Sequence, residues 1–294
     1  MQDERSLGTR PRGPAAIAVL AVALLLLGSC VTPPSELATR GPGMIIPLYI
    51  YPADHRGLLP EAFRAVATLA EENPELQILV VVNPANGPGE TVDPNYRRAV
   101  RRLSRSGAGV LGYVASGFGE RPVELMEADV ARWDRLYPGV SGIFLDELLW
   151  TWERPEYEGR VATVARSLRA AAADVGLGAI VVNPGTPVPW FYYEDFDVIV
   201  TYERPDWPAS PRDLVPPSVG RRRANLASRT GVLIYGEGVW NRERFEELAE
   251  EVGFLFVNDH DLDIGNIRSY PWSFLAGNMR QQAKILKERR LERP

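Results

Sequence analysis

The chain has 294 residues, of which 45% are hydrophobic and 24% charged, and its formal net charge is −5. This is the composition of a globular protein, and it excludes a disordered or fibrous chain. A mildly acidic chain without a basic block is a poor nucleic-acid binder, so we expect no nucleic-acid partner. With one Cys and two His, a disulfide framework and a Cys-based zinc site are excluded, and we predict neither metal nor cofactor.

The first thirty residues have the pattern of an export signal. Three arginines precede an uncharged run, Ala15–Leu27, which is too short to cross a bilayer comfortably and is typical of a signal peptide. The run leads into Leu27-Gly28-Ser29-Cys30, which resembles a bacterial lipobox, where the Cys is lipidated and becomes the mature N-terminus. A plain signal peptide is the alternative. We therefore expect a signal peptide over 1–29, a flexible tether rich in Pro and Gly over 30–43, and an exported protein anchored to the outer face of a bacterial membrane through Cys30.

From Met44 on, eight short apolar runs alternate with amphipathic stretches, which is the pattern of βα units around a parallel sheet. The expected strands are Met44–Tyr51, Gln77–Asn83, Gly109–Ala115, Gly142–Glu147, Ala179–Asn183, Phe196–Glu203, Gly231–Gly236 and Phe254–Asn258. The expected helices are Pro60–Glu72, Asn95–Ser104, Pro122–Leu136, Arg160–Ala173, Arg242–Val252 and Phe274–Leu291. The fifth and sixth connections are less regular, because one is aromatic and the other is interrupted by prolines.

Eight such units in roughly 250 residues predict a single α/β domain, a (β/α)₈ TIM-type barrel, over residues 44–294. The rival is a doubly wound open sheet. That fold usually carries a Gly-rich phosphate turn after its first strand, and Tyr51-Pro52-Ala53-Asp54 is not one.

Polar side chains collect where the expected strands end, which is the face of a barrel that carries the chemistry. We predict Asp146, Glu147 and Glu203 as catalytic acids. The candidates for substrate contacts are Tyr49, Tyr51, Asn83, Tyr113, Asn183, Tyr202, Tyr235, Glu237, Asn258 and Asp259. Asn83 and Asn183 both precede proline, so a purely conformational role in a turn is the alternative for each.

The pair Asp146-Glu147 is the most specific of these signals. Successive strand residues face opposite ways, so one acid should enter the site while the other leans across the rim or orients its neighbour. The alternative is that either acid caps the next helix or pairs with Arg154 or Arg160. Glu203 lies two strands further on and can face the pair across a cleft. Clustered carboxylates push their pKa values apart, which separates an acid from a base.

Aromatic residues follow many of the strands and offer flat faces with polar edges, which suit a pyranose ring. They are Trp150, Trp152, Trp190, Phe191, Tyr192, Tyr193, Trp207, Trp240 and Trp272, and we expect several of them simply to cover the barrel mouth. The stretch Asp259–Gly265 resembles a calcium loop, but its Gly falls one place late and Tyr270 stands where the last ligand, a Glu, should be.

Five stretches, in order along the chain, resemble the spherulin-4-like family. They are Ile45–Pro52, Val82–Gly89, Val110–Val114, Gly142–Glu147 and Asp197–Glu203. The resemblance implies a (β/α)₈ fold and a relation to fungal glycoside hydrolases of family 135, which cleave α-1,4-linked N-acetylgalactosamine in a secreted galactosaminogalactan. It also implies that Asp146, Glu147 and Glu203 match the acids tied to activity. The chain departs from the family pattern at Ser116 and Phe118, where the family has Thr and Tyr.

Three functions remain open at this point. The first is an exported glycoside hydrolase acting on an amino-sugar polysaccharide, in which one of Asp146 and Glu203 protonates the leaving oxygen. The other would act as nucleophile or activate water, unless an N-acetyl group of the substrate is itself the nucleophile. The second is a non-catalytic glycan-binding lipoprotein. The third is a metal-dependent hydrolase that uses Asp146, Glu147, Asp259 and Asp261, and the shortage of His argues against it.

Overall fold

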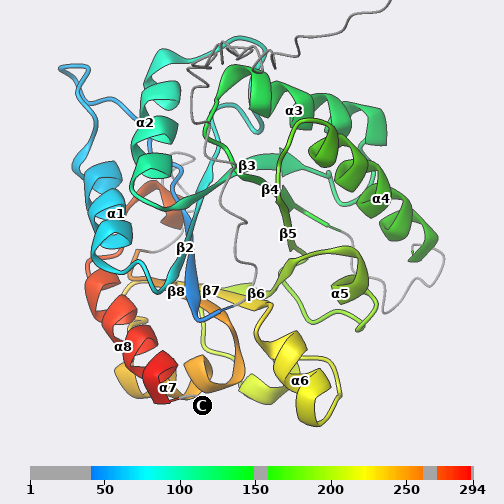
Figure 1. Ribbon diagram of the computed structural model, residues 1–294. Coiled ribbons are helices and arrows are strands. Elements are labelled where there is room, and N and C mark those ends of the chain that lie inside the picture. The colour runs from blue at the N-terminus through cyan, green and yellow to red at the C-terminus, as the bar shows by residue number, and fades with distance from the viewer. Residues whose placement is uncertain (1–40, 149–157, 261–269, 293–294) are drawn as a thin grey trace, which may run out of the picture. The chain divides into compact units, whose positions relative to one another are not determined.

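Eight parallel strands close into a barrel in which each strand pairs with its neighbours in sequence, from β1 to β8. The computed structural model describes residues 41–148, 158–260 and 270–292. Helices cover the outside of the barrel in Figure 1. The sequential order confirms the (β/α)₈ fold and is incompatible with a doubly wound sheet, whose strand order reverses. The expected signal peptide, Cys30 and the tether up to residue 40 lie outside the described residues.

Most expected elements are found within one to three residues of their expected ends. The strands are β1 Gly43–Pro47, β2 Gln77–Val82, β3 Gly109–Ala115, β4 Gly142–Asp146, β5 Ala179–Asn183, β6 Val198–Arg204, β7 Thr230–Tyr235 and β8 Phe254–Asn258. The helices are α1 Glu61–Glu72, α2 Pro94–Arg105, α3 Val123–Leu136, α4 Glu158–Asp174, α5 Tyr192–Asp195, α6 Gly220–Ala227, α7 Arg242–Glu251 and α8 Met279–Glu292, with short 3₁₀ turns η2 Pro211–Leu214 and η3 Pro271–Ser273. Among the residues that the structure describes, every helix is too short or too polar to span a membrane.

Two ends differ from expectation for a clear reason. The first strand was expected to reach Tyr51 but ends at Pro47, which has no N–H to donate to a ladder. The last helix was expected from Phe274 but begins at Met279. Backbone groups between Phe274 and Met279 bond to side chains outside the helix. The carbonyl of Phe274 accepts a hydrogen bond from the side chain of Asn258, and the N–H of Gly277 donates to Asp259.

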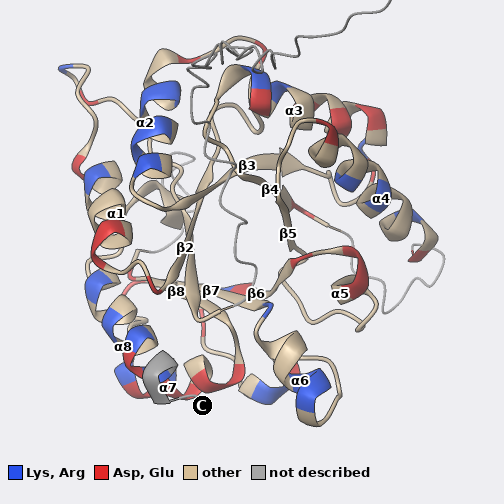
Figure 2. Ribbon diagram, in the orientation of Figure 1, with Lys and Arg blue, Asp and Glu red and all other residues tan. Residues whose placement is uncertain are grey.

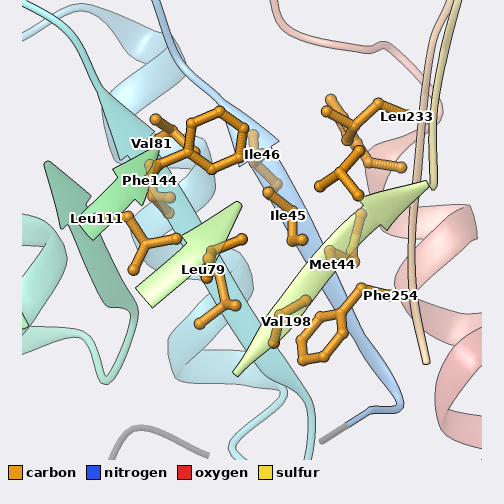
Figure 3. Packing of buried hydrophobic residues seen from close by; sticks show 14 of the residues in the cluster. Met44, Ile45, Ile46, Leu79, Val81, Leu111, Phe144, Val198, Leu233 and Phe254 are labelled. Atoms are coloured by element: carbon orange, nitrogen blue, oxygen red, sulfur yellow. The ribbon is translucent and has the colours of Figure 1, made fainter. Parts of the chain in front are cut away.

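The strands are almost free of charge, and this sets where polar chemistry can occur. Figure 2 shows the Lys, Arg, Asp and Glu residues mainly on the helices and loops. In the eight strands the charged residues are Asp146, Glu203 and Arg204, and all three stand at C-terminal ends. Below them, inward side chains such as Leu79, Leu111 and Phe144 fill the barrel (Figure 3). The interior is therefore a packed apolar core, and the charged residues of the strands lie at one end of it, the C-terminal end.

The two ends of the described chain lie at the other end of the barrel. β1 begins at Gly43, whose N–H donates to the carbonyl of Gly253 just before β8. Helix α8 runs back along the outside, and Lys287 in its last turns forms an ion pair with Glu75, just before β2. Both contacts lie where strands start, so the chain enters and leaves the barrel opposite the C-terminal ends of the strands.

Candidate active site

A pocket of about 430 Å³ opens at the C-terminal ends of the strands. Its volume is in the range of small-ligand sites. Aromatic rings and carboxylates line it together, and the described residues around it are Pro47, Tyr49, Asn83, Asn86, Tyr113, Phe144, Asp146, Glu147, Asn183, Glu203, Leu233, Tyr270, Trp272 and Ser273. Such a wall of aromatic faces with polar groups between them is suited to a sugar ring and its hydroxyl groups.

Asp146 enters the pocket from the end of β4. It pairs across the ladder with Asn183 of β5, so both side chains point into the barrel from neighbouring strands. The hydroxyl of Tyr113 donates to Oδ2 of Asp146 at 2.8 Å, and the amide Nδ2 of Asn183 donates to Oδ1 at the same distance. Each carboxylate oxygen therefore has a donor, which holds the group in one orientation.

Glu147 reaches the same pocket by leaving the strand. Its φ is +57°, a left-handed conformation that is strained for a residue other than glycine and is often found at functional sites. The backbone is held there because the hydroxyl of Ser116 donates to the carbonyl of Glu147 at 2.6 Å. The N–H of Gly117 donates to Oε2 of Glu147 at 3.2 Å. Thus Asp146 points into the barrel while Glu147 lies across the rim, and neither acid forms an ion pair with Arg160 in the described part of the chain.

Glu203 faces the pocket because β6 contains a bulge. Val200 pairs with Gly231 and Tyr202 pairs with the very next residue of β7, Val232, so Thr201 is an extra residue in the ladder. In a regular strand Val200 and Glu203 would face opposite sides. The bulge reverses the alternation, so Glu203 pairs with the pocket residue Leu233. Bulges that re-aim a side chain are common beside active sites.

Asn183 joins the two half-buried acids Asp146 and Glu203. Its Nδ2 donates to Asp146 and also forms a short hydrogen bond with Oε2 of Glu203. The nearest oxygens of the two carboxylates are therefore no more than two hydrogen-bond lengths apart. On its other side, Oε1 of Glu203 accepts a hydrogen bond from the indole N–H of Trp272 at 2.9 Å.

The pKa values of both acids are raised above their ordinary values. Burial, the larger effect, and the negative charge of Asp146 raise the pKa of Glu203 to about 7, against the hydrogen bonds from Asn183 and Trp272. Burial also raises the pKa of Asp146, while hydrogen bonds from Tyr113 and Asn183 lower it. Both shifts are upward, so the two carboxyl groups together retain a proton to a higher pH than isolated acids would. Burial raises the pKa of Tyr49 and Tyr113 well above normal, so both phenols remain hydrogen-bond donors.

This raised pKa predicts a pH dependence of stability. The pKa of Glu203 is about 7 in the folded protein against an ordinary value of 4.5, so the folded chain binds more protons than the unfolded chain between these pH values. The free energy of unfolding must then fall as the pH rises through that window. Replacing Glu203 with Gln should remove this dependence, which is on the order of 2–3 kcal/mol. Urea unfolding of the wild type and of Glu203→Gln at pH 5 and pH 8 measures this dependence. If the free energy of unfolding falls by the same amount in both proteins between the two pH values, the raised pKa does not belong to Glu203.

The sequence comparison places the chain in a family. The family model described as Spherulation-specific family 4 matches residues 43–280. The chain belongs to this family. A curated relative in it, Spherulin-4 of Physarum polycephalum, is 29% identical over 161 residues, which make up 54% of this chain and 44% of the relative. This member thus matches less than half the length of that relative.

The fold is also that of a solved structure. The crystal structure of Aspergillus clavatus Sph3 in complex with GalNAc superimposes with a TM-score of 0.63 at 19% sequence identity. The match covers 84% of this chain and 98% of Sph3. At this identity the comparison shows a shared barrel, in agreement with the strand order.

In this member of the spherulation-specific family, the pocket brings together many of the residues that the sequence analysis selected. Those that line it are Tyr49, Asn83, Tyr113, Asp146, Glu147, Asn183 and Glu203. Asn83 has both of the roles considered for it, because it lines the pocket while its Oδ1 accepts a hydrogen bond from Gly87 N at 3.0 Å and so shapes the loop.

Six other candidates lie outside the pocket lining, and their contacts explain why. The hydroxyl of Tyr51 donates to Asp93 at the start of α2, and that of Tyr202 donates to Asp206. Glu237 is exposed in the turn after β7. Asp259 accepts a hydrogen bond from Gly277.

The remaining two of these six, Tyr235 and Asn258, lie behind Trp272 and contact its ring and its loop. Asp261, proposed with Asp259 as a metal ligand, lies outside the described residues.

The aromatic residues divide in the same way. Trp272 lines the pocket, whereas Tyr192 and Tyr193 are 0% and 3% exposed in the core and offer no face to a sugar. Trp150 and Trp152 lie outside the described residues. Sequence reasoning missed Asn86, Tyr270 and Ser273. Asn86 lies in Val82–Gly89, one of the five stretches that resemble the family, and that stretch could have indicated it. Nothing in the local pattern marks the other two.

Proposed function

We propose that this protein is a glycoside hydrolase that cleaves an amino-sugar polysaccharide of the α-1,4-galactosaminan type by carboxylate acid/base catalysis. The observation that carries the proposal is the pair Asp146 and Glu203, which share the amide of Asn183 in an aromatic-lined pocket. The choice of an amino sugar is supported by the family resemblance and by the GalNAc bound in the structure of Sph3, whose fold this chain shares.

In this mechanism Glu203 is the general acid. With its pKa raised to about 7 it holds a proton near neutral pH and can deliver it to the leaving glycosidic oxygen. Asp146 is the charged partner that faces the anomeric carbon, and Glu147 on the rim orients the sugar. A separation of roughly 5 Å between carboxylates is typical of retaining enzymes, whereas inverting enzymes need room for a water molecule. The shared amide supports retention.

The test is release of reducing ends from acetylated and de-N-acetylated α-galactosaminan by the fragment Val31–Pro294. Release from either polymer, with the α-anomer formed first in ¹H NMR, is the expected result. Binding of these polymers without release would support the second function considered above, a glycan-binding barrel without turnover. If there is neither binding nor release, the proposed substrate class is wrong.

We also propose that the protein is exported and held at the outer face of a bacterial membrane through lipidated Cys30. The proposal rests on the signal-like pattern of residues 1–30. Replacing Cys30 with Ser should release the protein from the membrane fraction, and unchanged fractionation would contradict it.

A further inference from the structure

The barrel has a weak seam between β1 and β8. These strands share a single pair, Gly43 with Phe254, whereas β7 and β8 share five. One reason for the short pairing is that Pro47 has no N–H that could donate a hydrogen bond to β8. Beyond it, the N–H of Tyr49 donates at 2.9 Å to the carbonyl of Trp272 instead of to a strand. The turn η3 therefore occupies the top of the seam.

Asn258 holds this turn from the β8 side. Its side chain is fully buried, and its Nδ2 donates to the carbonyl of Pro271 at 2.8 Å and to that of Phe274 at 3.0 Å. These two carbonyls flank Trp272, so one amide fixes the backbone on both sides of the tryptophan. A buried amide that satisfies two carbonyls is costly to remove, because both would be left unpaired.

The ring of Trp272 is held as firmly as its backbone. Tyr235 meets it edge-on with ring centres 5.7 Å apart, and Phe256 packs at 6.1 Å. The tryptophan is 5% exposed, and its N–H points to Oε1 of Glu203 at 2.9 Å. Asn258 itself does not line the pocket, and its side chain is connected to Glu203 through the turn that carries Trp272.

We propose that Asn258 is a positioning residue, which clamps η3 so that the indole N–H of Trp272 donates a hydrogen bond to Glu203. Its importance for turnover rests on the proposed function, but its effect on Glu203 does not. A hydrogen bond donated to a carboxylate stabilises the charged form and lowers its pKa. The variants below leave in place the other titratable side chains that line the pocket with Glu203 in the described chain, which are Asp146, Glu147, Tyr49, Tyr113 and Tyr270.

The experiment measures the pKa of Glu203 directly, by NMR of protein labelled with ¹³C at the glutamate carboxyl carbon and assigned with Glu203→Gln. Trp272→Phe should raise this pKa by roughly one to two units, because a hydrogen bond to a charged group is lost. Asn258→Leu should raise it by roughly half to one unit, since the indole stays but is no longer held. Asn258→Ser keeps one donor and should give a smaller rise in the same direction.

Gln282→Leu is the matched control. Gln282 is also fully buried, and its amide pairs with both the N–H and the carbonyl of Val257, next to Asn258 in β8. Its loss weakens the same strand without touching η3. A pKa that rises in the Asn258 variants and stays at the wild-type value in Gln282→Leu supports the proposal.

The proposal is overturned if Asn258→Leu leaves the pKa unchanged or if Gln282→Leu raises it equally. If Asn258→Leu does not fold, Asn258→Ser decides. These readings stand even if no polymer is cleaved, which would count against the proposed function alone. With a cleaved polymer, the alkaline limb of the pH–rate profile should move with the pKa.

Discussion

Replacing Glu203 with Gln is expected to lower kcat on the cleaved polymer by about 10³-fold or more, because the variant cannot donate a proton to the leaving oxygen. Asp146→Asn should cause a loss of similar size, since it removes the charge that faces the developing positive centre. Both substitutions keep the size of the side chain. Each carboxylate accepts one hydrogen bond from Asn183 and a second from Tyr113 or Trp272, and the amide that replaces it keeps one acceptor oxygen for these two donors. Steady-state release of reducing ends at pH 6 measures both effects.

Glu237→Gln is the matched control for these variants. Glu237 also follows a strand end, but it is exposed and lies outside the pocket lining, so its kcat and KM should equal those of the wild type. Polymer binding by Glu203→Gln should persist, because the aromatic wall is intact. A hydrolase that retains most of its activity in Glu203→Gln or Asp146→Asn would contradict the catalytic assignment.

A large loss of stability is expected from adding one methyl group at Gly112 in β3. A Cβ built there lies 2.4 Å from Cδ2 of the Trp133 ring in α3. The ring is fully buried and has no room to retreat, because its Nε1 donates at 2.9 Å to the carbonyl of Tyr113. Gly112→Ala should therefore reduce the free energy of unfolding by about 2–3 kcal/mol, as overpacked cores do. Urea unfolding measures this reduction.

Gly159→Ala provides the comparison. This glycine lies in α4 with no atom near the added Cβ, so the variant should be as stable as the wild type or slightly more stable, given the helix propensity of alanine. A second variant, Gly112→Ala with Trp133→Leu, should lose less stability than the two single substitutions added together, because the smaller side chain relieves the clash. If Gly112→Ala and the wild type have the same free energy of unfolding, helix α3 packs less closely on β3 than the 2.4 Å contact implies.

The barrel could be predicted from the sequence because its strands are buried on both faces. Such strands are continuous apolar runs, and the ends of β3, β5 and β8 agree with the expected ones to the residue. The polar residues at strand ends were also visible, since they interrupt these runs. Alternation along β4 predicted that only one acid of the pair Asp146-Glu147 would point inward, and the structure shows Asp146 doing so.

The remaining features depend on contacts that no local pattern encodes. Strict alternation along β6 would have placed Glu203 on the side opposite Val200, and the extra residue Thr201 reverses this. Asn258 has the same residue type and strand-end position as Asn183, yet it serves the loop rather than the pocket. Its role depends on η3, which the expected helix from Phe274 did not include. Tertiary packing, not periodicity, assigns these roles.

The course of the chain bears on how the pocket meets a large substrate. β1 starts at Gly43 and α8 ends near Glu75, so both ends of the described chain lie away from the pocket mouth. A bead or a fusion partner joined to the described chain at residue 41 or residue 292 would start on the side of the barrel away from the pocket. Under the proposed function, the pocket mouth of a molecule held in this way would stay open to a long polymer.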